Sequence, residues 1–488
     1  MATTTETAAR RAPAIETRSI DWVPTTERHG KLWHQAPLWF LGNFQYFSIP
    51  IGFIGPGLGL SIGWTVLASG LGLIVGTLFM AFHASQGPQM GLPQMIQSRA
   101  QFGYRGVIIP LFATLFTYIA FNVTDQVLLG SGFNAAFGWN AQVVAIVAAV
   151  FAALLAIYGH DWVHRFFRWI LYVSLPLTLI VTLGVIFGAA GGHTPHAHFG
   201  FTWVAFMAQF SAAAAYNITY APYVSDYSRY LPGNTSPRAV ITSVFFGAAT
   251  AAFWLMALGA WLAIRLGATD GLAGLQLAGN NVLGHLGDVV AFLSALALMA
   301  TMGMNAYGGA LSTLTAIDSF KSIKPTRRAR IITILGLSVL WYAIGESITG
   351  GAVNTVFSSL TLMLYLLVPW TATNLIDYFF VRRGHYAITE LFRSDGLYGV
   401  WAWRGLVAYF IGFLFEVPFM VLPQLGNWSY TGFVAKQING VDIAWIVGLV
   451  VTSVAYLAIT RNLNLSAEQR AEAASNQELG ALELMEIA

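Results

Sequence analysis

The chain of 488 residues contains no cysteine and few charged residues. Without cysteine it can form no disulfide and can hold no metal through thiolates. Charged residues make up 9% of the chain and hydrophobic residues 56%, whereas a soluble domain carries about 25% charged residues. The composition therefore excludes an ordinary soluble protein and predicts a chain that crosses a membrane several times.

Motifs for nucleotide or zinc chemistry are missing as well. The chain has neither a Gly-Lys-Ser/Thr phosphate loop nor a His-Glu-x-x-His pair. An ATP-driven pump also needs a nucleotide-binding domain, and no polar stretch is long enough for one. We therefore expect no enzyme, no cofactor, no metal site and no nucleic-acid partner, and we expect any transport to be passive or driven by a gradient.

Apolar runs long enough to cross a bilayer, which takes about 20 residues, predict an all-α polytopic membrane protein with twelve transmembrane helices. The predicted spans are 36–60, 62–84, 107–136, 140–158, 166–190, 201–224, 238–264, 284–310, 330–346, 352–376, 402–424 and 441–460. The predicted units are an N-terminal tail 1–35, a ten-helix core 36–376, a segment 377–460 with two extra helices, and a C-terminal tail 461–488.

The distribution of lysine and arginine supports this count. With twelve spans, 22 of the 24 Lys and Arg residues fall on the side of the two termini. Loops rich in Lys and Arg stay in the cytoplasm. We therefore expect a multi-pass protein of the plasma (inner) membrane with both termini in the cytoplasm.

Two spans are interrupted by residues that disturb a helix. The first contains Gly52 and Pro56, and the sixth carries polar residues at 216–222 and ends this stretch with Pro222. Irregular backbone at membrane depth survives only where protein or a water-filled cavity satisfies it. Interrupted spans at matching positions of two repeats indicate a midplane binding site, so we predict a 5+5 inverted repeat (about 36–190 and 201–376) with broken helices 1 and 6.

Polar side chains recur at membrane depth in three spans. Tyr118 and Asn122 are four residues apart in the third span and share a helix face. Asn305 lies in the eighth span, and its amide offers donors and an acceptor to a ligand with amide-like edges, such as a nucleobase. Tyr216 and Tyr220 of the sixth span could stack on a flat ring. Each of these residues could equally serve helix packing, and only their combination indicates a binding site.

Asp125 is a carboxyl group within the third span. An ionisable residue at membrane depth is by default a functional hypothesis. Two interpretations stay open: a proton relay, or a structural carboxylate near the helix end that bonds Gln126. At the cytoplasmic ends, Asp226 precedes Arg229 and Asp377 precedes Arg382. These four charges predict ion pairs or latches of a gate.

Three segments resemble signatures of the nucleobase:cation symporter-1 family, which includes purine-cytosine permeases. They are 221–232 (APYVSDYSRYLP), 374–386 (NLIDYFFVRRGHY), and 91–93 (GLP) followed by 98–103 (SRAQFG). The resemblance runs from about residue 30 to 460. It implies two inverted five-helix repeats plus two helices, and uptake of a nucleobase or related heterocycle with Na⁺ or H⁺.

The resemblance also implies roles for single residues. An aromatic residue and an amide of the third helix contact the ring in this family, and Tyr118 and Asn122 match these positions, although the usual aromatic is Trp. Tyr220, with Tyr216 as the alternative, matches the aromatic residue of the broken sixth helix. Asn305 matches an Asn of the eighth helix.

The residues at the positions of the family's sodium site differ from those of its Na⁺-coupled members. Na⁺-coupled members carry a Ser-Thr pair five and six residues before the eighth-helix Asn, where this chain has Ala300 and Met299. Only Thr301 lies near. Since these two side chains offer no oxygen ligand, the sequence favours H⁺, with Asp125 as the carrier, and Na⁺ stays an alternative.

The sequence therefore predicts a secondary active importer of a purine, cytosine or related heterocycle that works by alternating access in the lipid bilayer. Allantoin, a hydantoin, uracil or a vitamin precursor are the alternative substrates. A channel-like protein or a transceptor is the alternative from another class. The sequence does not indicate an oligomeric state.

Overall fold

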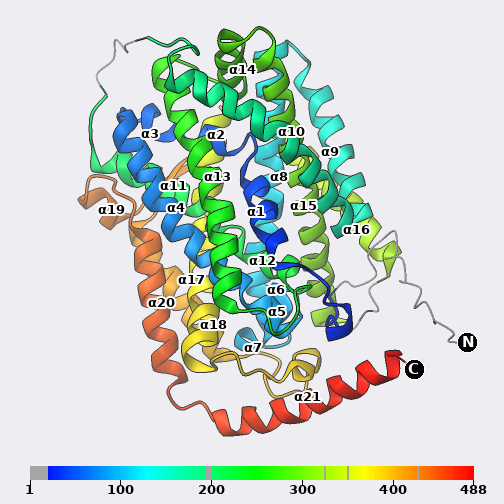
Figure 1. The fold of residues 1–488 in the computed structure, drawn as a ribbon. Coiled ribbons are helices and arrows are strands. Elements are labelled where there is room, and N and C mark those ends of the chain that lie inside the picture. Colours follow the sequence, from blue (N-terminus) through cyan, green and yellow to red (C-terminus); the bar gives the residue numbers. More distant parts are fainter. Residues whose placement is uncertain are drawn as a thin grey trace, which may run out of the picture.

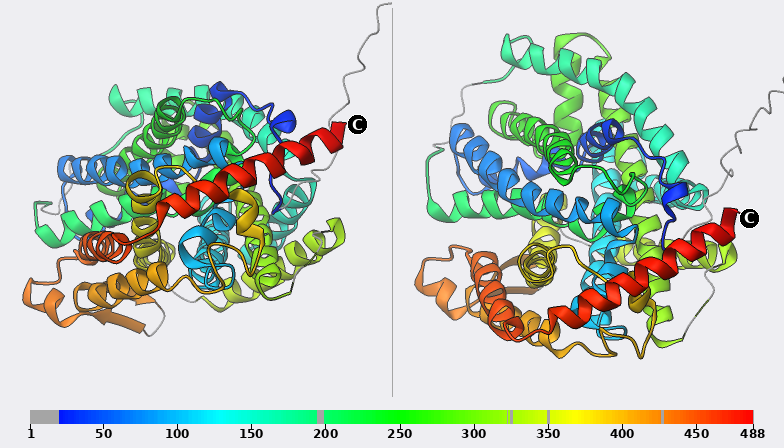
Figure 2. Two further views of the ribbon diagram at one scale, coloured as in Figure 1. Left: turned by 90° about the horizontal axis from the view of Figure 1, so that it is seen from below. Right: turned by 60° about the horizontal axis from the view of Figure 1, so that its bottom comes forward.

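The computed structural model describes residues 20–193, 199–321, 323, 326–348, 351–425 and 428–487. The predicted N-terminal tail is thus described only from residue 20. Most helices run along one direction and form a single bundle (Figure 1). One long helix, α21 (Leu465–Ile487), lies across the lower end of the bundle (Figures 1 and 2).

Eight helical segments of the described residues are long and apolar enough to cross a membrane. The helices that make up these segments are α4 (Ile62–Ala84), α8 (Ile108–Phe137), α9 (Ala141–Tyr158), α10 (His160–Ile186), α13 (Pro237–Arg265), α15 (Leu286–Phe320), α16 (Arg327–Ser347) and α17 (Ala352–Ile376). They confirm eight of the predicted spans. Helix α15 continues ten residues beyond the predicted end at 310.

The other four predicted spans contain shorter helices. They are α1 (Gln35–Asn43), α2 (Ser48–Ile51) and α3 (Ile54–Gly57) in the first span, α11 (Trp203–Ile218) and α12 (Ala221–Ser228) in the sixth, α18 (Trp403–Glu416) in the eleventh and α20 (Ala444–Thr460) in the twelfth. Helices thus lie in all twelve predicted ranges, and spans one and six are broken as expected. The inverted repeat stays a prediction.

The breaks lie close to the predicted residues but not at all of them. Gly52 lies in the gap between α2 and α3, as expected. Pro56 was predicted to break the first span and instead lies inside α3. In the first turn of a helix the missing N–H of proline costs nothing. The same holds for Pro222, which is near the start of α12, directly after the break at Thr219 and Tyr220.

The predicted span 402–424 is wrong at its end, and the fold is not purely helical. Helix α18 ends at Glu416 and is followed by a short 3-10 turn, η5 (Val417–Phe419). Val417 keeps right-handed helical dihedrals (φ −50°, ψ −44°), but Pro418 has no N–H with which to continue the α-helical hydrogen bonds. The chain then forms an antiparallel hairpin of β1 (Val421–Leu425) and β2 (Trp428–Thr431).

Several short elements had no counterpart in the predicted spans. They are α5 (Gln86–Met90), α6 (Gln94–Gln97), α7 (Arg99–Phe102), α14 (Gly271–Val282), α19 (Phe433–Gln437), the 3-10 turns η1 (Thr25–Glu27), η2 (Leu32–His34) and η4 (Ile388–Phe392), and a π-helical turn, η3 (Asp377–Val381).

Helix α21 is fixed to the loop between α17 and α18 through one of its faces. Its contacts are Glu468 with Arg382 (2.6 Å), Glu472 with His385 (3.1 Å), Ser475 with the N–H of Thr389 (3.0 Å) and Glu478 with Arg393 (3.2 Å). These contacts explain why a polar tail with little hydrophobic character is ordered as a helix on the end of the bundle.

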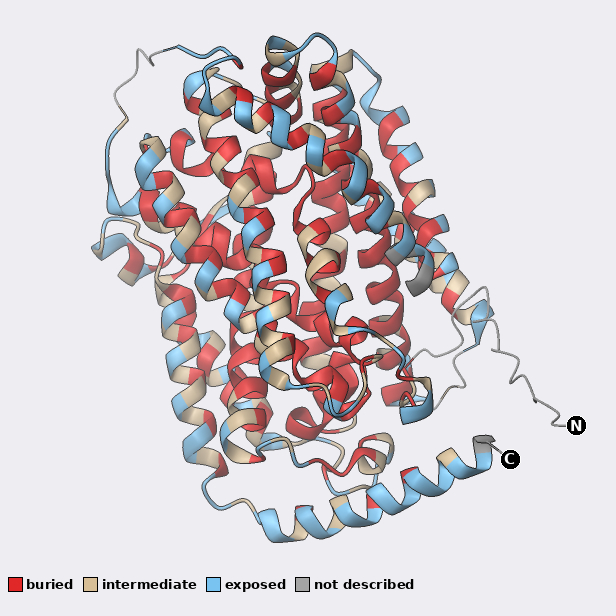
Figure 3. Cartoon of the chain, in the orientation of Figure 1, coloured by how far each residue is buried: buried red, intermediate tan, exposed pale blue. Residues whose placement is uncertain are grey.

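Buried residues face the centre of the bundle, and the outer helix faces are exposed (Figure 3). The exposed faces nevertheless carry large apolar side chains, such as Val339 on α16 and Phe246 on α13. Such continuous apolar surface is unfavourable in water. Its presence on the outside of the bundle supports contact with lipid.

Glycines bring α4 and α11 into backbone contact. A Cβ atom at Gly76 would lie 2.1 Å from the carbonyl oxygen of Ala214, and one at Gly72 would lie 2.3 Å from that of Phe210. Glycines four residues apart allow this close approach of membrane helices. The contact holds the second span against the upper half of the broken sixth span.

We expect Gly76→Ala to destabilise the protein, because the new methyl group meets backbone that cannot move aside. Overpacking of this kind costs roughly 1–3 kcal/mol, which should lower the midpoint of thermal unfolding of the purified protein. Gly63→Ala on the same helix is the matched control, since a Cβ there meets nothing within 4 Å. Equal midpoints for the two variants would contradict this packing.

Candidate functional site

The broken spans meet at their breaks in the centre of the bundle. Gln45, in the gap between α1 and α2, donates a hydrogen bond to the hydroxyl of Tyr216 (2.8 Å). The hydroxyl of Tyr220 donates to the carbonyl oxygen of Gly42 (3.1 Å). Side chains of the sixth span thus satisfy polar groups that the first span leaves open where its helix is interrupted, as the membrane interior requires.

Aromatic rings line this junction. Tyr216 stacks on Phe47 with ring centroids 5.4 Å apart and planes 9° from parallel. Tyr220 stacks on Phe121 of α8, with centroids 5.7 Å apart. All four rings are buried. The predicted stacking residues of the sixth span therefore face α8 and the first break, where a flat ring could be held between aromatic faces.

Tyr118 contacts the sixth span at a different residue from the predicted Tyr216 or Tyr220. Its ring contacts Tyr223 of α12, with centroids 4.9 Å apart. Its hydroxyl lies so close to Gly308 of α15 that a Cβ there would be 2.6 Å away. Phe121, three residues further along α8, is the residue that faces Tyr220. Three residues cover nearly one turn, so both rings lie toward the same side of α8 one turn apart along its axis, and each contacts a different tyrosine of the sixth span.

Asn122 and Asn305 form a direct amide pair between α8 and α15. The side-chain nitrogen of Asn305 donates to the side-chain oxygen of Asn122 (3.0 Å), and Asn122 donates to the carbonyl oxygen of Met302 (3.2 Å). Tyr223 donates to the side-chain oxygen of Asn305 (3.4 Å). The two predicted amides are thus brought together from positions 183 residues apart.

Tyr223 was missed by the sequence reasoning. It lies in the predicted sixth span 201–224 and in the signature segment 221–232, but it was not among the predicted binding residues. Its hydroxyl reaches Asn305 and its ring contacts Tyr118. The spacing signal was present, since Tyr216, Tyr220 and Tyr223 follow a helical repeat of four and three residues.

Asp125 is buried one turn from Asn122 on α8, with 1% of its surface exposed. Neither of its side-chain oxygens has a hydrogen-bond partner among the described residues. The alternative that Asp125 bonds Gln126 does not hold, because the Gln126 amide nitrogen donates to Glu346 (3.1 Å) and Tyr342 (3.3 Å) of α16. Thr301 of α15 is buried, and its hydroxyl donates to Ala297 in its own helix (3.2 Å).

A pocket lies toward the end of the bundle opposite α21, beside the start of α14. It has a volume of about 360 Å³, and Tyr46, Pro50, Leu128 and Asp270 are among its lining residues. Leu128 is three residues beyond Asp125 on α8. Asp270 caps the start of α14 and accepts hydrogen bonds from Tyr46 and Ser131 (3.3 Å each). The pocket thus lies beside the interrupted part of the first span, which lines it with Tyr46 and Pro50.

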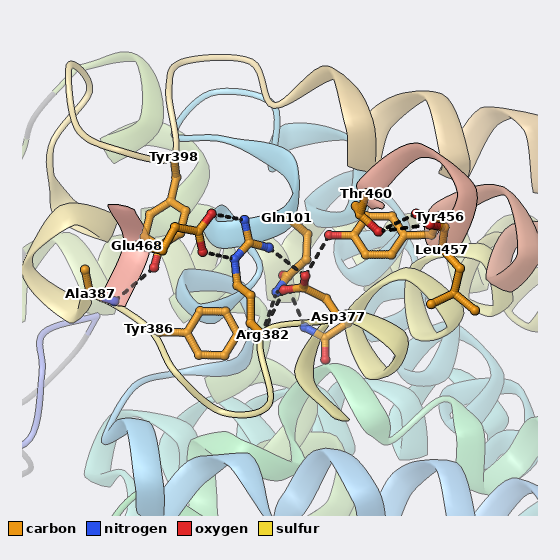
Figure 4. A network of polar contacts seen from close by, with 11 residues as sticks. Gln101, Asp377, Arg382, Tyr386, Ala387, Tyr398, Tyr456, Leu457, Thr460 and Glu468 are labelled. Atoms are coloured by element: carbon orange, nitrogen blue, oxygen red, sulfur yellow. Dashed lines mark hydrogen bonds and ion pairs between the residues drawn. The ribbon is translucent and has the colours of Figure 1, made fainter. Parts of the chain in front are cut away.

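At the other end of the bundle, Asp377 and Arg382 form an ion pair within a larger network (Figure 4). Arg382 donates to one oxygen of Asp377 (2.6 Å), which also accepts from Tyr456 (2.8 Å). The second oxygen accepts from Gln101 (2.6 Å) and Tyr386 (2.8 Å). Burial, and to a smaller extent the negative charge of Asp377, raise the pKa of Tyr386 well above its usual value. The hydroxyl of Tyr386 therefore keeps its proton and donates the hydrogen bond.

Asp226 and Arg229 lie on and directly after α12. One oxygen of Asp226 accepts a hydrogen bond from the N–H of Gln94 in α6 (2.9 Å). The guanidinium group of Arg229 lies over the ring of Tyr230, 5.0 Å from its centroid. The short helices α6 and α7 therefore contact the broken sixth span through Asp226 and the end of α17 through Asp377.

Among known proteins, residues 22–448 match the family described as permeases for cytosine/purines, uracil, thiamine and allantoin. A Bacillus subtilis protein assigned as a purine-cytosine permease, YxlA, is 34% identical over 92% of this chain and 96% of its own. The Bacillus subtilis allantoin permease is 24% identical over 78% of this chain and 80% of its own.

The fold also matches solved structures. Mhp1, a nucleobase-cation-symport-1 family transporter solved in a closed conformation with bromovinylhydantoin, superimposes with a TM-score of 0.71 at 17% identity, covering 94% of this chain and 99% of Mhp1. Inward-facing Mhp1 gives a TM-score of 0.68. These findings confirm the predicted fold class and the resemblance. The chain is a membrane transporter and not an enzyme, and it belongs to the family of permeases for cytosine/purines, uracil, thiamine and allantoin.

Proposed function

We propose that this protein is a cation-coupled secondary active importer of a purine, cytosine or closely related heterocycle. The observation that carries the proposal is the amide pair of Asn122 and Asn305 beside the stacked tyrosines at the junction of the two broken spans. Amides match the donor and acceptor edge of a nucleobase, and aromatic faces match its flat surface. The names of the relatives support the same class of substrate.

In this proposal the heterocycle lies against the stacked rings and takes over hydrogen bonds of the amide pair. Tyr220 and Tyr216 provide the stacking face from the sixth span, with Phe121 opposite Tyr220. Tyr118 acts beside Tyr223 at the edge of the site. Because Tyr118 stands where the family usually has Trp, the choice among heterocycles depends on this corner, and a hydantoin or allantoin stays the alternative substrate.

The proposed coupling ion is H⁺, carried by Asp125. The support is its burial one turn from Asn122 and the lack of a hydrogen-bond partner among the described residues. The pocket past Leu128 offers a route from the outer end. Met299 and Ala300 bring no side-chain oxygen for Na⁺, and the hydroxyl of Thr301 is bonded within its helix.

We further propose that the bundle end with α21 faces the cytoplasm, as the lysine and arginine count predicts. There, Asp226 connects α12 to α6, and Asp377 connects α17 to α7. An inward path along the broken sixth span requires these connections to open. At the outer end Asp270 bridges Tyr46 and Ser131 in the same structure. Alternating access would then open the inner connections while the Asp270 contacts keep the outer end closed, and the reverse.

The amide pair gives the sharpest test of the site. We expect Asn122→Ala and Asn305→Ala each to lower uptake of radiolabelled adenine or cytosine into proteoliposomes roughly 5- to 150-fold, since losing one good hydrogen bond to a buried ligand costs roughly 1–3 kcal/mol. Ser338→Ala is the matched control, because its hydroxyl bonds only Ile334 in its own helix (2.9 Å). Unchanged uptake in both Asn variants, at equal protein content, would contradict the site.

The coupling role of Asp125 is tested by separating coupling from binding. We expect Asp125→Asn to abolish uptake driven by an inwardly directed proton gradient without Na⁺, while exchange of labelled for unlabelled substrate persists, because exchange needs no net proton movement. Glu346→Gln removes an exposed carboxyl beside the same helix and should behave as wild type. Uptake by the unaltered protein that needs Na⁺ and ignores the pH gradient would refute the proton assignment.

The hydrogen-bond network around Asp377 should stabilise the conformation in which the inner end of the bundle is closed. Asp377→Asn removes the charge that holds Arg382 and weakens closure, so the inner end should open more often. Since the chain has no cysteine, a thiol introduced at Ser312 of α15 is the only one present. We expect its labelling from the cytoplasmic side to accelerate several-fold in Asp377→Asn. The exposed loop carboxylate variant Asp395→Asn should leave labelling unchanged, and equal rates in all backgrounds would exclude a gating role for Asp377.

A further inference from the structure

A second pocket lies at the end of the bundle where α17, α20 and α21 meet. It has a volume of about 530 Å³ and is open to the outside. Its lining residues include Phe380, Arg382, Arg383, His385, Leu457, Arg461 and Glu468. Helices α20 and α21 enclose an angle of 90° here, so the pocket occupies the corner between a spanning helix and a helix that lies along the end of the bundle.

Two of the three arginines that line the pocket have no carboxylate partner among the described residues. Arg382 is paired with Asp377 and Glu468. Arg383 and Arg461 are exposed, and neither has an ion pair or hydrogen bond with a described side chain. Two arginines therefore present free guanidinium groups to the same space, and a guanidinium group is suited to bind phosphate oxygens in pairs.

The backbone that carries Arg383 is fixed in an unfavourable conformation. Arg383 has a φ of 54° and Gly384 a φ of 83°. A positive φ is uncommon for a residue other than glycine. Two backbone hydrogen bonds close the turn. The N–H of Arg382 donates to the carbonyl oxygen of Asp377 (2.8 Å), and the N–H of His385 donates to the carbonyl oxygen of Arg382 (3.1 Å). The ion pair of Asp377 and Arg382 thus also holds Arg383 at the edge of the pocket.

The other side of the pocket is apolar and exposed. Phe380 is 64% exposed at the end of α17 and η3, and Leu457 is 44% exposed in the last turn of α20. Both residues belong to segments that end at the membrane boundary, where acyl chains contact protein. The pocket therefore joins an anion-binding part to a lipid-facing part.

We propose that this pocket binds the headgroup of an anionic phospholipid, with Arg383 and Arg461 on its phosphate and Phe380 and Leu457 against its acyl chains. Basic pockets between spanning helices on the cytoplasmic side are suited to such headgroups. The shared chemistry is a phosphate anion. The volume and the apolar rim favour a lipid over free inorganic phosphate. Binding would brace the corner of α20 and α21 whatever the protein transports.

The test is a thermal unfolding titration of the purified full-length protein in a neutral detergent. Phosphatidylglycerol is the probe, phosphatidylcholine the uncharged comparison and inorganic phosphate the soluble anion. Because a ligand that binds only the folded state raises its stability, we expect phosphatidylglycerol alone to raise the unfolding midpoint. In Arg383→Gln/Arg461→Gln, its apparent affinity should fall roughly 30-fold, or about 2 kcal/mol.

Two further variants keep the outcome interpretable. Arg461→Gln alone changes one exposed side chain and should weaken binding roughly fivefold, even if the double variant folds poorly. Arg470→Gln removes the same charge from α21 outside the pocket and should titrate as wild type. A phosphatidylglycerol shift of equal affinity in wild type and Arg461→Gln would overturn the site. An equal shift with inorganic phosphate would overturn the lipid as its ligand.

Discussion

The need to satisfy backbone polar groups inside a membrane governs this structure. Spans one and six give up helical hydrogen bonds in the middle of the bilayer, which is costly unless other groups replace them. At the first break, the side-chain oxygen of Gln45 accepts from the N–H of Phe47 (2.6 Å), and the hydroxyl of Tyr220 donates to the carbonyl oxygen of Gly42. The side-chain oxygen of Gln209 accepts from the N–H of Gly55 at the start of α3 (2.7 Å). Two side chains of the sixth span, Gln209 and Tyr220, therefore satisfy backbone groups of the broken first span.

The same constraint places the functional groups. Since the breaks must face protein, they face α8 and α15, which bring Asn122 and Asn305 into contact beside the rings of the sixth span. The glycine contact of α4 with α11 fixes the upper part of the sixth span, and the hydrogen bond of Asp226 with α6 fixes its lower part. A segment held at both ends but interrupted in the middle is suited to bend at the site when the two ends of the bundle open in turn.

Charged side chains are concentrated at one end of the bundle. Some of them form the network around Asp377, and others line the basic pocket beside it. Asp377 accepts four hydrogen bonds from three separate parts of the chain and so ties α7, α17 and α20 together. Arg382 continues the network to Glu468 of α21. The neighbouring Arg383 has no ion pair in this network among the described residues, and it lines the basic pocket at the edge of the network together with Arg461.

The sequence by itself determined the class of protein, the ranges of most spans and the two broken spans, and it singled out the two amides of the proposed site, because hydropathy, proline and polar residues at membrane depth are local signals. It also located Asp377 and Arg382 as partners, since they are only five residues apart. Only the tertiary structure decided that Phe121 rather than Tyr118 faces Tyr220, that Tyr223 joins the site, and that α21 closes over the loop after α17. These outcomes depend on helix rotation and on contacts between residues far apart in the chain, which no local pattern encodes.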